Sequence, residues 1–161
     1  MQSQPQKDLI KRGADLGDTG SLLVLTIILS GIGFILMPIA LRRLSKAYGN
    51  GTLWRNTLIA IIALFIAGIF GRAVAVAPAS IGDPVIIAMA LVSYAFALLY
   101  GWLIRSAFNE LRMLSGIEEF GKAAWWNWLG AILSIVIVGI ALIWIGYYHA
   151  RRGFKKLESQ Q

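Results

Sequence analysis

Apolar residues are concentrated in four long blocks of the chain, at 21–41, 53–71, 84–104 and 123–148. Three of these blocks contain no charged residue, and the second contains only Arg55, close to its beginning. A helix needs about 20 apolar residues to cross a bilayer core that is about 30 Å thick. Because backbone groups in lipid must be hydrogen-bonded within their own segment, each block is predicted to be a transmembrane helix.

The alternative is a soluble all-helical protein, which would need a polar stripe along the outer face of each helix. No such stripe is visible in the four blocks. Only 14% of the chain is charged, whereas typical soluble domains carry about 25% charged residues. We therefore predict an all-α fold, a four-transmembrane-helix bundle that passes several times through the cell membrane.

The membrane domain is predicted to cover 21–150, as two helical hairpins at 21–77 and 84–150. Residues 1–20 form a polar tail, which the pattern allows as either a short interfacial helix or a frayed segment. Residues 151–161 form a basic C-terminal tail on the same side. Lys and Arg then divide eight to seven between the two sides, which does not decide the orientation. The C-terminal basic cluster favours tails on the inside.

The second and fourth blocks resemble each other, which indicates an internal repeat. Segments 53–70 and 124–141 align at a constant offset of 71, with eight identical positions among eighteen. Both hairpins begin on the same side, so the repeat is predicted to be parallel, with an axis near the membrane normal. The identical positions are Trp54/Trp125, Asn56/Asn127, Leu58/Leu129, Ala60/Ala131, Ile61/Ile132, Ile66/Ile137, Gly68/Gly139 and Ile69/Ile140.

Small residues recur at four-residue spacing on the second and third predicted helices. Such rows let helix backbones approach closely in lipid, so these two helices are predicted to pack together. Chance in an Ala- and Gly-rich chain is the alternative. The matched glycines of the repeat are also expected to be closely packed, so that leucine there would force helices apart. The candidate packing residues are Ala63, Ala67, Gly71, Ser93, Ala97 and Gly101 in the rows, and Gly68 and Gly139 in the repeat.

Aromatic residues near the block ends are predicted to be interfacial anchors, because tryptophan and tyrosine collect at the level of the lipid headgroups. Two groups are expected on opposite membrane faces: Trp54, Trp102, Trp125, Trp126 and Trp128 on one, and Trp144, Tyr147 and Tyr148 on the other. Asn56 and Asn127 occupy the same place in both repeats. They are interpreted either as a pseudo-symmetric polar pair that holds the hairpins together or as a small polar site on the pseudo-twofold axis.

The interiors of the blocks hold no ionisable residue, whereas transport and catalytic sites within membranes are usually marked by one. The chain has no cysteine, and its single histidine, His149, lies in a basic segment without a neighbouring carboxylate. We therefore predict no enzyme activity and no catalytic, cofactor or metal site. The net charge of +7 lies in loops and tails, which indicates contact with anionic membrane lipids and not with nucleic acid.

Two stretches, LSKAYGNGTLWRNTLIAIIALFIAGI and FNELRMLSGIEEFGKAAWWNWLGAILSIVIVGIALI, resemble the small archaeal four-helix integral membrane proteins grouped as a domain of unknown function. The resemblance covers roughly residues 9–157. Because that family has no assigned activity, the resemblance implies no site residue. The leading hypothesis is a non-enzymatic structural or accessory membrane subunit that acts through helix contacts, as a homo-oligomer or in a larger membrane complex. The alternative is a small oligomeric transporter or channel.

Overall fold

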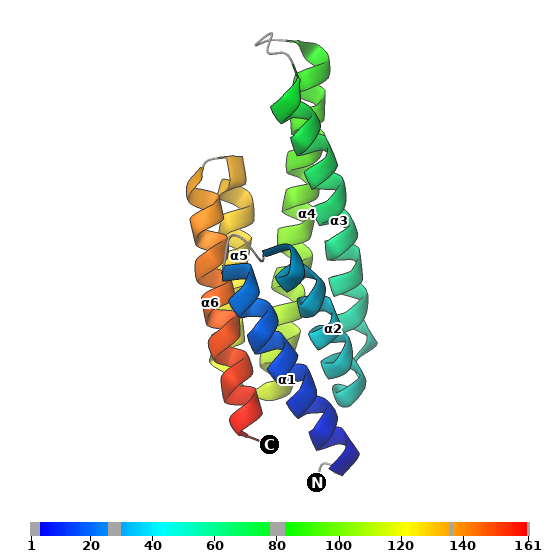
Figure 1. Ribbon diagram of the computed structural model, residues 1–161, viewed down its shortest axis with the longest axis vertical. Helices are drawn as coiled ribbons and strands as arrows, with labels where there is room; N and C mark the ends of the chain where they lie inside the picture. The colour runs from blue at the N-terminus through cyan, green and yellow to red at the C-terminus, as the bar shows by residue number, and fades with distance from the viewer. Residues whose placement is uncertain (1–3, 26–29, 78–82, 136, 161) are drawn as a thin grey trace.

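The structure, a computed structural model, describes residues 4–25, 30–77, 83–135 and 137–160. All regular structure in these residues is helical, which confirms the predicted all-α class. Consecutive helices pair as antiparallel hairpins, and both chain ends lie at the same end of the molecule (Figure 1). The elements are α1 (Gln4–Leu25), α2 (Ser30–Tyr48), α3 (Gly51–Val76), α4 (Pro84–Ser115), α5 (Glu118–Ile132), the short 3-10 helix η1 (Leu133–Ile135) and α6 (Ile137–Ser159).

The predicted four-helix bundle is wrong, because the described residues form six α-helices. Block 21–41 does not form one helix, since α1 ends at Leu25 and α2 begins at Ser30. Block 123–148 is divided in the same way between α5 and α6. Each of these blocks supplies the apolar ends of two antiparallel helices instead of one spanning helix. Among the described helices, only α3 and α4 are long and apolar enough to cross a membrane.

The blocks are divided because the polar segments beside them carry apolar faces of their own. Ile10 and Ala14, in the expected N-terminal tail, have no exposed surface. Phe154 and Leu157, in the expected C-terminal tail, are equally buried. A long α1 and a long α6 bury these side chains against the other helices only if the chain turns back within each apolar block. Both expected tails are therefore parts of packed helices.

Two glycines allow the close approaches that this arrangement requires. A Cβ atom on Gly139 would overlap the backbone carbonyl of Leu133, so glycine permits the tight return from α5 into α6. A Cβ atom on Gly17 would overlap the ring of Phe154, so glycine lets α1 lie directly against α6. The contact between α1 and α6 brings the two ends of the chain together at one end of the molecule (Figure 1).

The internal repeat is not supported by the structure. Segment 53–70 lies entirely within α3, whereas segment 124–141 runs from α5 through η1 into α6. The glycines that the alignment equates also differ in their surroundings. A Cβ atom on Gly68 would have no atom within 4 Å, whereas Gly139 is packed against Leu133. The similarity between the segments therefore reflects shared apolar composition.

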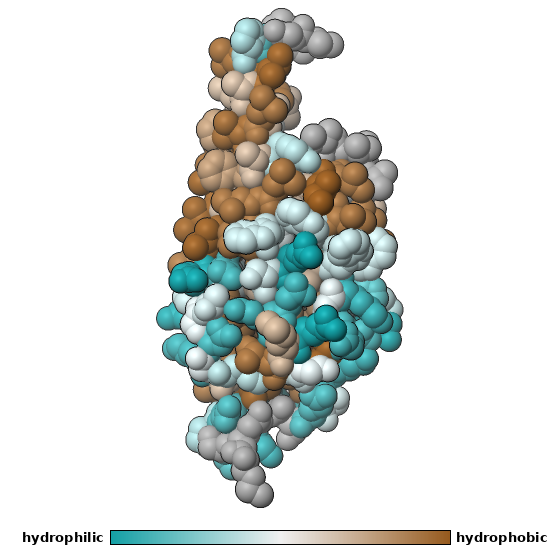
Figure 2. Space-filling view, turned by 180° about the vertical axis from the view of Figure 1, so that it is seen from behind, coloured by the Kyte–Doolittle hydropathy of each residue, from teal (hydrophilic) through white to brown (hydrophobic). Residues whose placement is uncertain are grey.

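The buried core lies toward the end of the molecule that holds both termini, the polar end. Phe120 of α5 is at its centre, with its ring centroid 6.2 Å from that of Phe108 in α4 and 5.0 Å from that of Phe154 in α6. Ile10 of α1 and Leu44 of α2 belong to the same core. Figure 2 shows hydrophilic residues gathered at the polar end and hydrophobic residues at the opposite, apolar end, where the α3–α4 hairpin projects beyond the other helices.

Candidate functional site

Arginine side chains lie over aromatic rings at the boundary between the polar and the apolar ends. These cation–π pairs link α2 to α3 and α4 to α5, and one pair lies within α6. An aromatic ring attracts a guanidinium through its electron-rich face and holds it in place. We call these pairs the collar: Arg42–Trp54, Arg105–Trp128 and Arg152–Tyr148, whose guanidinium carbons lie 5.4, 5.8 and 6.0 Å from the ring centroids.

The collar marks the boundary between the charged and the largely uncharged part of the molecule. All of the 15 Lys and Arg residues except Arg72, and all of the 8 Asp and Glu residues except Asp83, lie on helix segments at the collar or on its polar side. The eight-to-seven division expected from the sequence depended on blocks 21–41 and 123–148 each forming one helix. Because these blocks are divided, α2 and α6 both run back to the polar end and place their charges there.

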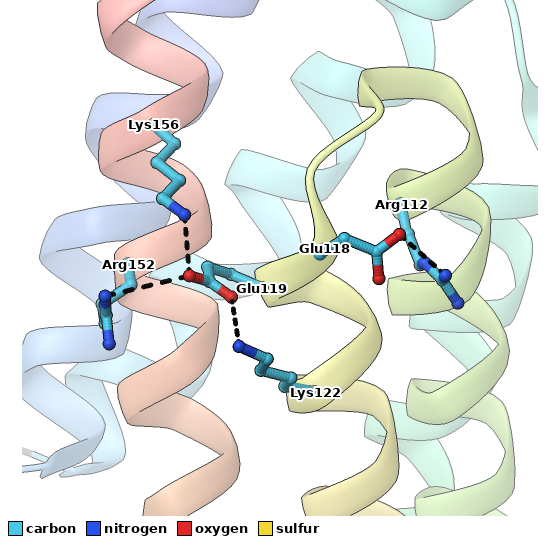
Figure 3. Close-up of polar contacts among 6 residues, drawn as sticks. All are labelled: Arg112, Glu118, Glu119, Lys122, Arg152 and Lys156. Atoms are coloured by element: carbon cyan, nitrogen blue, oxygen red, sulfur yellow. Dashed lines mark hydrogen bonds and ion pairs between the residues drawn. The ribbon is translucent and has the colours of Figure 1, made fainter.

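At the polar end, Glu119 holds α5 to α6 through several basic side chains (Figure 3). Its carboxylate is 2.7 Å from the Lys156 ammonium group, 3.3 Å from that of Lys122 and 3.9 Å from the Arg152 guanidinium. The hydrogen bond from Lys156 is the main cause that lowers the pKa of Glu119, and burial opposes it. Only 5% of the Glu119 side chain is exposed. We interpret the cluster as structural, because its basic side chains are already paired with the Glu119 carboxylate.

Two further ion pairs connect other helices at this end. Arg151 of α6 donates to Asp18 of α1 over 3.0 Å. Arg112 of α4 donates over 2.8 Å to Glu118, at the start of α5 (Figure 3). His149, the single histidine, packs its ring edge-on against Tyr148, and burial lowers its pKa. Among the residues that the structure describes, no group of three His, Cys, Asp or Glu side chains could hold a metal ion.

An apolar groove of about 860 Å³ runs along α3 on the apolar side of the collar. The α3 side chains in it recur every three or four residues, so they share one face of the helix. The sequence does not indicate this groove, because it forms only when α2 lies beside α3 and residues of α4 and α6 complete its walls. The groove is lined by Ile35, Met37 and Pro38 of α2, Trp54, Thr57, Leu58, Ile61, Leu64, Phe65, Gly68, Ile69 and Arg72 of α3, Tyr100 and Ile104 of α4, and Tyr147 of α6.

The predicted small-residue rows lie at two different helix contacts. On α3, Ala63 and Ala67 are buried, and the Ala67 carbonyl accepts a hydrogen bond of 2.9 Å from the Ser93 hydroxyl of α4. A Cβ atom on Gly71 would lie 3.2 Å from that hydroxyl. Ala97, partly buried, shares a small hollow with Gly71 and Ser93. Gly101 faces α5, where a Cβ atom would overlap that of Ala131.

The two asparagines do not lie in one site. Asn56 donates a hydrogen bond of 3.1 Å to the Ser106 hydroxyl and so connects α3 to α4 beside the collar. Asn127 is completely buried, donates to the Ala123 carbonyl over 2.9 Å and lies directly against Gly146 of α6. Each asparagine therefore stabilises its own hairpin.

The aromatic residues expected on two membrane faces are redistributed, because α5 and α6 lie side by side. Tyr147, expected as an anchor, is buried and shares a hydrogen bond of 2.8 Å with Tyr100. Tyr148 is exposed and belongs to the collar together with Trp54 and Trp128. Among the other expected anchors, Trp126 is partly buried, and the exposed ones are Trp102, Trp125 and Trp144.

The fold thus defines an all-α protein with a charged, packed end and a projecting apolar hairpin of two helices that could cross a membrane. A model of the family described as "Protein of unknown function (DUF996)" matches residues 77–147, which cover α4, α5 and the first part of α6. The chain is also similar to an uncharacterized protein of Methanocaldococcus jannaschii, with 23% identity over 150 residues that cover 83% of this chain and 85% of the relative. No solved structure matches the chain.

Proposed function

We propose that the protein is a non-enzymatic integral membrane protein in which α3 and α4 span the bilayer and the other two hairpins enter it only partway. The observation that carries this proposal is the distance from the collar to the tip of each hairpin. Arg72 follows Trp54 by eighteen residues on α3, or about 27 Å along a helix. Arg105 follows Asp83, the N-cap of α4, by twenty-two residues, or about 33 Å. Both lengths match a hydrocarbon core of about 30 Å.

The α5–α6 hairpin is shorter on the apolar side of the collar. Only eleven residues separate Ile137, the start of α6, from Tyr148 in the collar, or about 17 Å of helix. Its tip would therefore lie near the middle of the bilayer. The α3–α4 hairpin exposes large apolar side chains where it projects, among them Phe65, Ile69 and Leu91. Continuous apolar surface of this kind is typical of a face that meets lipid or another protein.

The charge distribution supports one orientation. Cytoplasmic segments close to the membrane carry an excess of Lys and Arg. The collar and the polar end hold every Lys and Arg except Arg72. In the proposed arrangement the polar end therefore faces the cytoplasm, and the short connection between α3 and α4 reaches the opposite side.

Cysteine labelling tests this arrangement, because the chain has no native cysteine. Single cysteines at Lys46, Met113 and Ser159, all exposed at the polar end, should react with a membrane-impermeant thiol reagent from the same side. A cysteine at Val76 should react only from the other side, and one at Leu133 from neither. Opposite labelling of Met113 and Ser159 would restore the four-helix arrangement. Labelling of Val76 together with Ser159 would show that the α3–α4 hairpin does not cross.

We assign the protein a structural or accessory role through contacts with lipid and with other membrane helices. The described polar side chains connect helices to one another, as Asn56, Ser93 and Glu119 do. Liposomes that contain the purified protein should show no selective flux of ions or small solutes. Reproducible selective flux would instead favour a transporter or channel.

A further inference from the structure

We propose that the groove along α3 binds one phospholipid with an anionic headgroup, which contacts Arg42 beside Trp54 while an acyl chain lies along α3 toward Gly68. The site rests on the proposed insertion of α3 and α4 into the bilayer. A site of this kind defines the lipid class, the position of the headgroup and the side chains that select it, none of which follows from insertion alone.

The most enclosed part of the groove lies in the half nearer the collar. Between the levels of Asn56 and Ala67 on α3, where those residues are hydrogen-bonded to α4, side chains from three other helices line the groove, namely Met37 of α2, Tyr100 of α4 and Tyr147 of α6. Toward the far end the lining comes from α3 alone. A ligand would therefore be held more tightly in the half of the groove nearer the collar than toward the apolar end. This matches a phospholipid whose headgroup lies at the collar and whose acyl chain extends toward the apolar end.

The length and chemistry of the groove fit an acyl chain. Phe65 follows Trp54 by eleven residues on the same face of α3, a distance of about 17 Å. This is about half of a hydrocarbon core of about 30 Å, or one leaflet. The hydroxyl groups that line the groove already have partners. The Thr57 hydroxyl donates to the Leu53 carbonyl over 2.7 Å, and the Tyr100 and Tyr147 hydroxyls share a hydrogen bond, so they do not require a polar ligand.

The charge at the mouth selects an anionic headgroup. The Arg42 guanidinium is held over Trp54, which lines the groove. Within the described part of the chain, Arg42 forms no ion pair, whereas Arg112 and Arg151 pair with Glu118 and Asp18. A guanidinium presents a planar set of donors that matches two phosphate oxygens at once. Arg42 is exposed, so those donors are accessible to a headgroup.

The chain contains a matched control for this charge. Arg105 lies over Trp128 in the same cation–π geometry, but Trp128 does not line the groove. The two arginines therefore differ mainly in whether an apolar channel begins beside their tryptophan. Arg43, next to Arg42 on α2, provides a second control for the local charge without a contact to Trp54.

The experiment measures retained lipid on the purified full-length protein by native mass spectrometry. Phosphatidylglycerol and phosphatidylcholine with identical long chains are the two probes. The expected result is one retained phosphatidylglycerol per chain, with an affinity about tenfold higher than that of phosphatidylcholine, the size of effect that one charge-assisted contact gives. Arg42→Gln should remove this preference, while Arg105→Gln and Arg43→Gln should leave it in place.

A second variant tests the acyl path independently of charge. Gly68 lines the groove, and a Cβ atom there would have no atom within 4 Å, so Gly68→Phe should fold and extend into the channel. It should weaken retention of both long-chain lipids by several-fold and leave short-chain phosphatidylglycerol unaffected. Thermal unfolding in detergent, followed by circular dichroism, verifies that each variant is folded.

Three outcomes would overturn the proposal. Equal loss of phosphatidylglycerol in Arg42→Gln and Arg105→Gln would show a general effect of charge. Unchanged long-chain retention in Gly68→Phe would place the chain elsewhere. A dimer that Gly68→Phe abolishes would identify a second copy of this protein as the occupant of the groove. Failure of the cysteine-labelling pattern is a separate result, since that experiment reports insertion in the membrane and not lipid selection.

Discussion

The Glu119 carboxylate and the Lys156 ammonium group share a hydrogen bond of 2.7 Å that ties the beginning of α5 to the end of α6. Glu119→Gln should lower the free energy of unfolding by about 1–3 kcal/mol, because it removes a charged acceptor and leaves its basic neighbours without a counter-ion. These neighbours are about half exposed, so solvent screening limits the loss. Urea unfolding in detergent measures the change. Glu118→Gln is the control and should cost less than about 0.5 kcal/mol, since the Glu118–Arg112 pair is exposed.

The same carboxylate gives a pH dependence of defined sign. The pKa of Glu119 is lowered in the folded protein, chiefly by Lys156. Its stabilising contribution is therefore complete above the ordinary glutamate pKa of about 4.3 and is lost as the pH falls through the lowered folded-state pKa. Unfolding measured from pH 7 to pH 3 should show a steeper acid loss in the native protein than in Glu119→Gln. Parallel curves would contradict the assigned role of Glu119.

The contact between Gly101 and Ala131 should be intolerant of added volume. Gly101→Ala places a Cβ atom where that of Ala131 already lies, so α4 and α5 must separate. We expect a loss of about 1–3 kcal/mol in unfolding free energy. The double variant Gly101→Ala with Ala131→Gly exchanges the two side chains and should recover most of this loss. Gly51→Ala, at a site with no atom within 4 Å, should have little effect.

The two glycines that the sequence alignment equated should respond differently to substitution. Gly139→Ala should destabilise the protein by at least about 1 kcal/mol, because its Cβ atom would overlap the Leu133 backbone, which cannot move as a flexible side chain would. Gly68→Ala should be neutral or stabilise α3 by up to about 1 kcal/mol, since alanine is the better helix former. Thermal unfolding of the two variants in the same detergent compares them directly. Equal losses would favour the repeat that the structure does not support.

The aromatic core at the polar end should account for much of the stability. Phe154 has no exposed surface and lies against both Phe120 and Gly17. Phe154→Ala should cost about 3–5 kcal/mol through lost contacts and the resulting cavity. Phe65→Ala is a matched control, because the Phe65 side chain projects from α3 at the apolar end with 68% of its surface exposed. In detergent it should change the unfolding free energy by less than about 0.5 kcal/mol.

The helical class and the positions of the apolar segments were predictable from the sequence, but the number of helices was not. Long apolar blocks predict helices in lipid whether they cross once or turn back. The divided blocks contain no charged residue, and the usual turn dipeptides are represented in them only by Ser30-Gly31, at the start of α2. The informative residues lay outside the blocks. Ile10 and Ala14 recur at helical spacing in a segment interpreted as a tail, and Gly17 in the same segment is a contact point for Phe154.

The groove and the collar were harder to predict, because both depend on contacts between helices that are distant in sequence. Tryptophan near a block end predicts a position at the membrane boundary, and Trp54 and Trp128 lie in the collar. Nothing in the order of residues places Arg105 over Trp128, or Tyr147 against Tyr100. The first contact depends on how α5 packs against α4, and the second also on the return of α6 along α5, which the Gly139 backbone allows.

The unequal lengths of the hairpins have a mechanical consequence for the surrounding bilayer. In the proposed arrangement all six described helices occupy the leaflet next to the polar end, whereas only α3 and α4 continue through the distant one. The protein then displaces more lipid area on one side of the bilayer midplane than on the other, as a wedge does. Such a shape favours membranes that bulge toward the polar end, so the protein should accumulate where curvature has that sign.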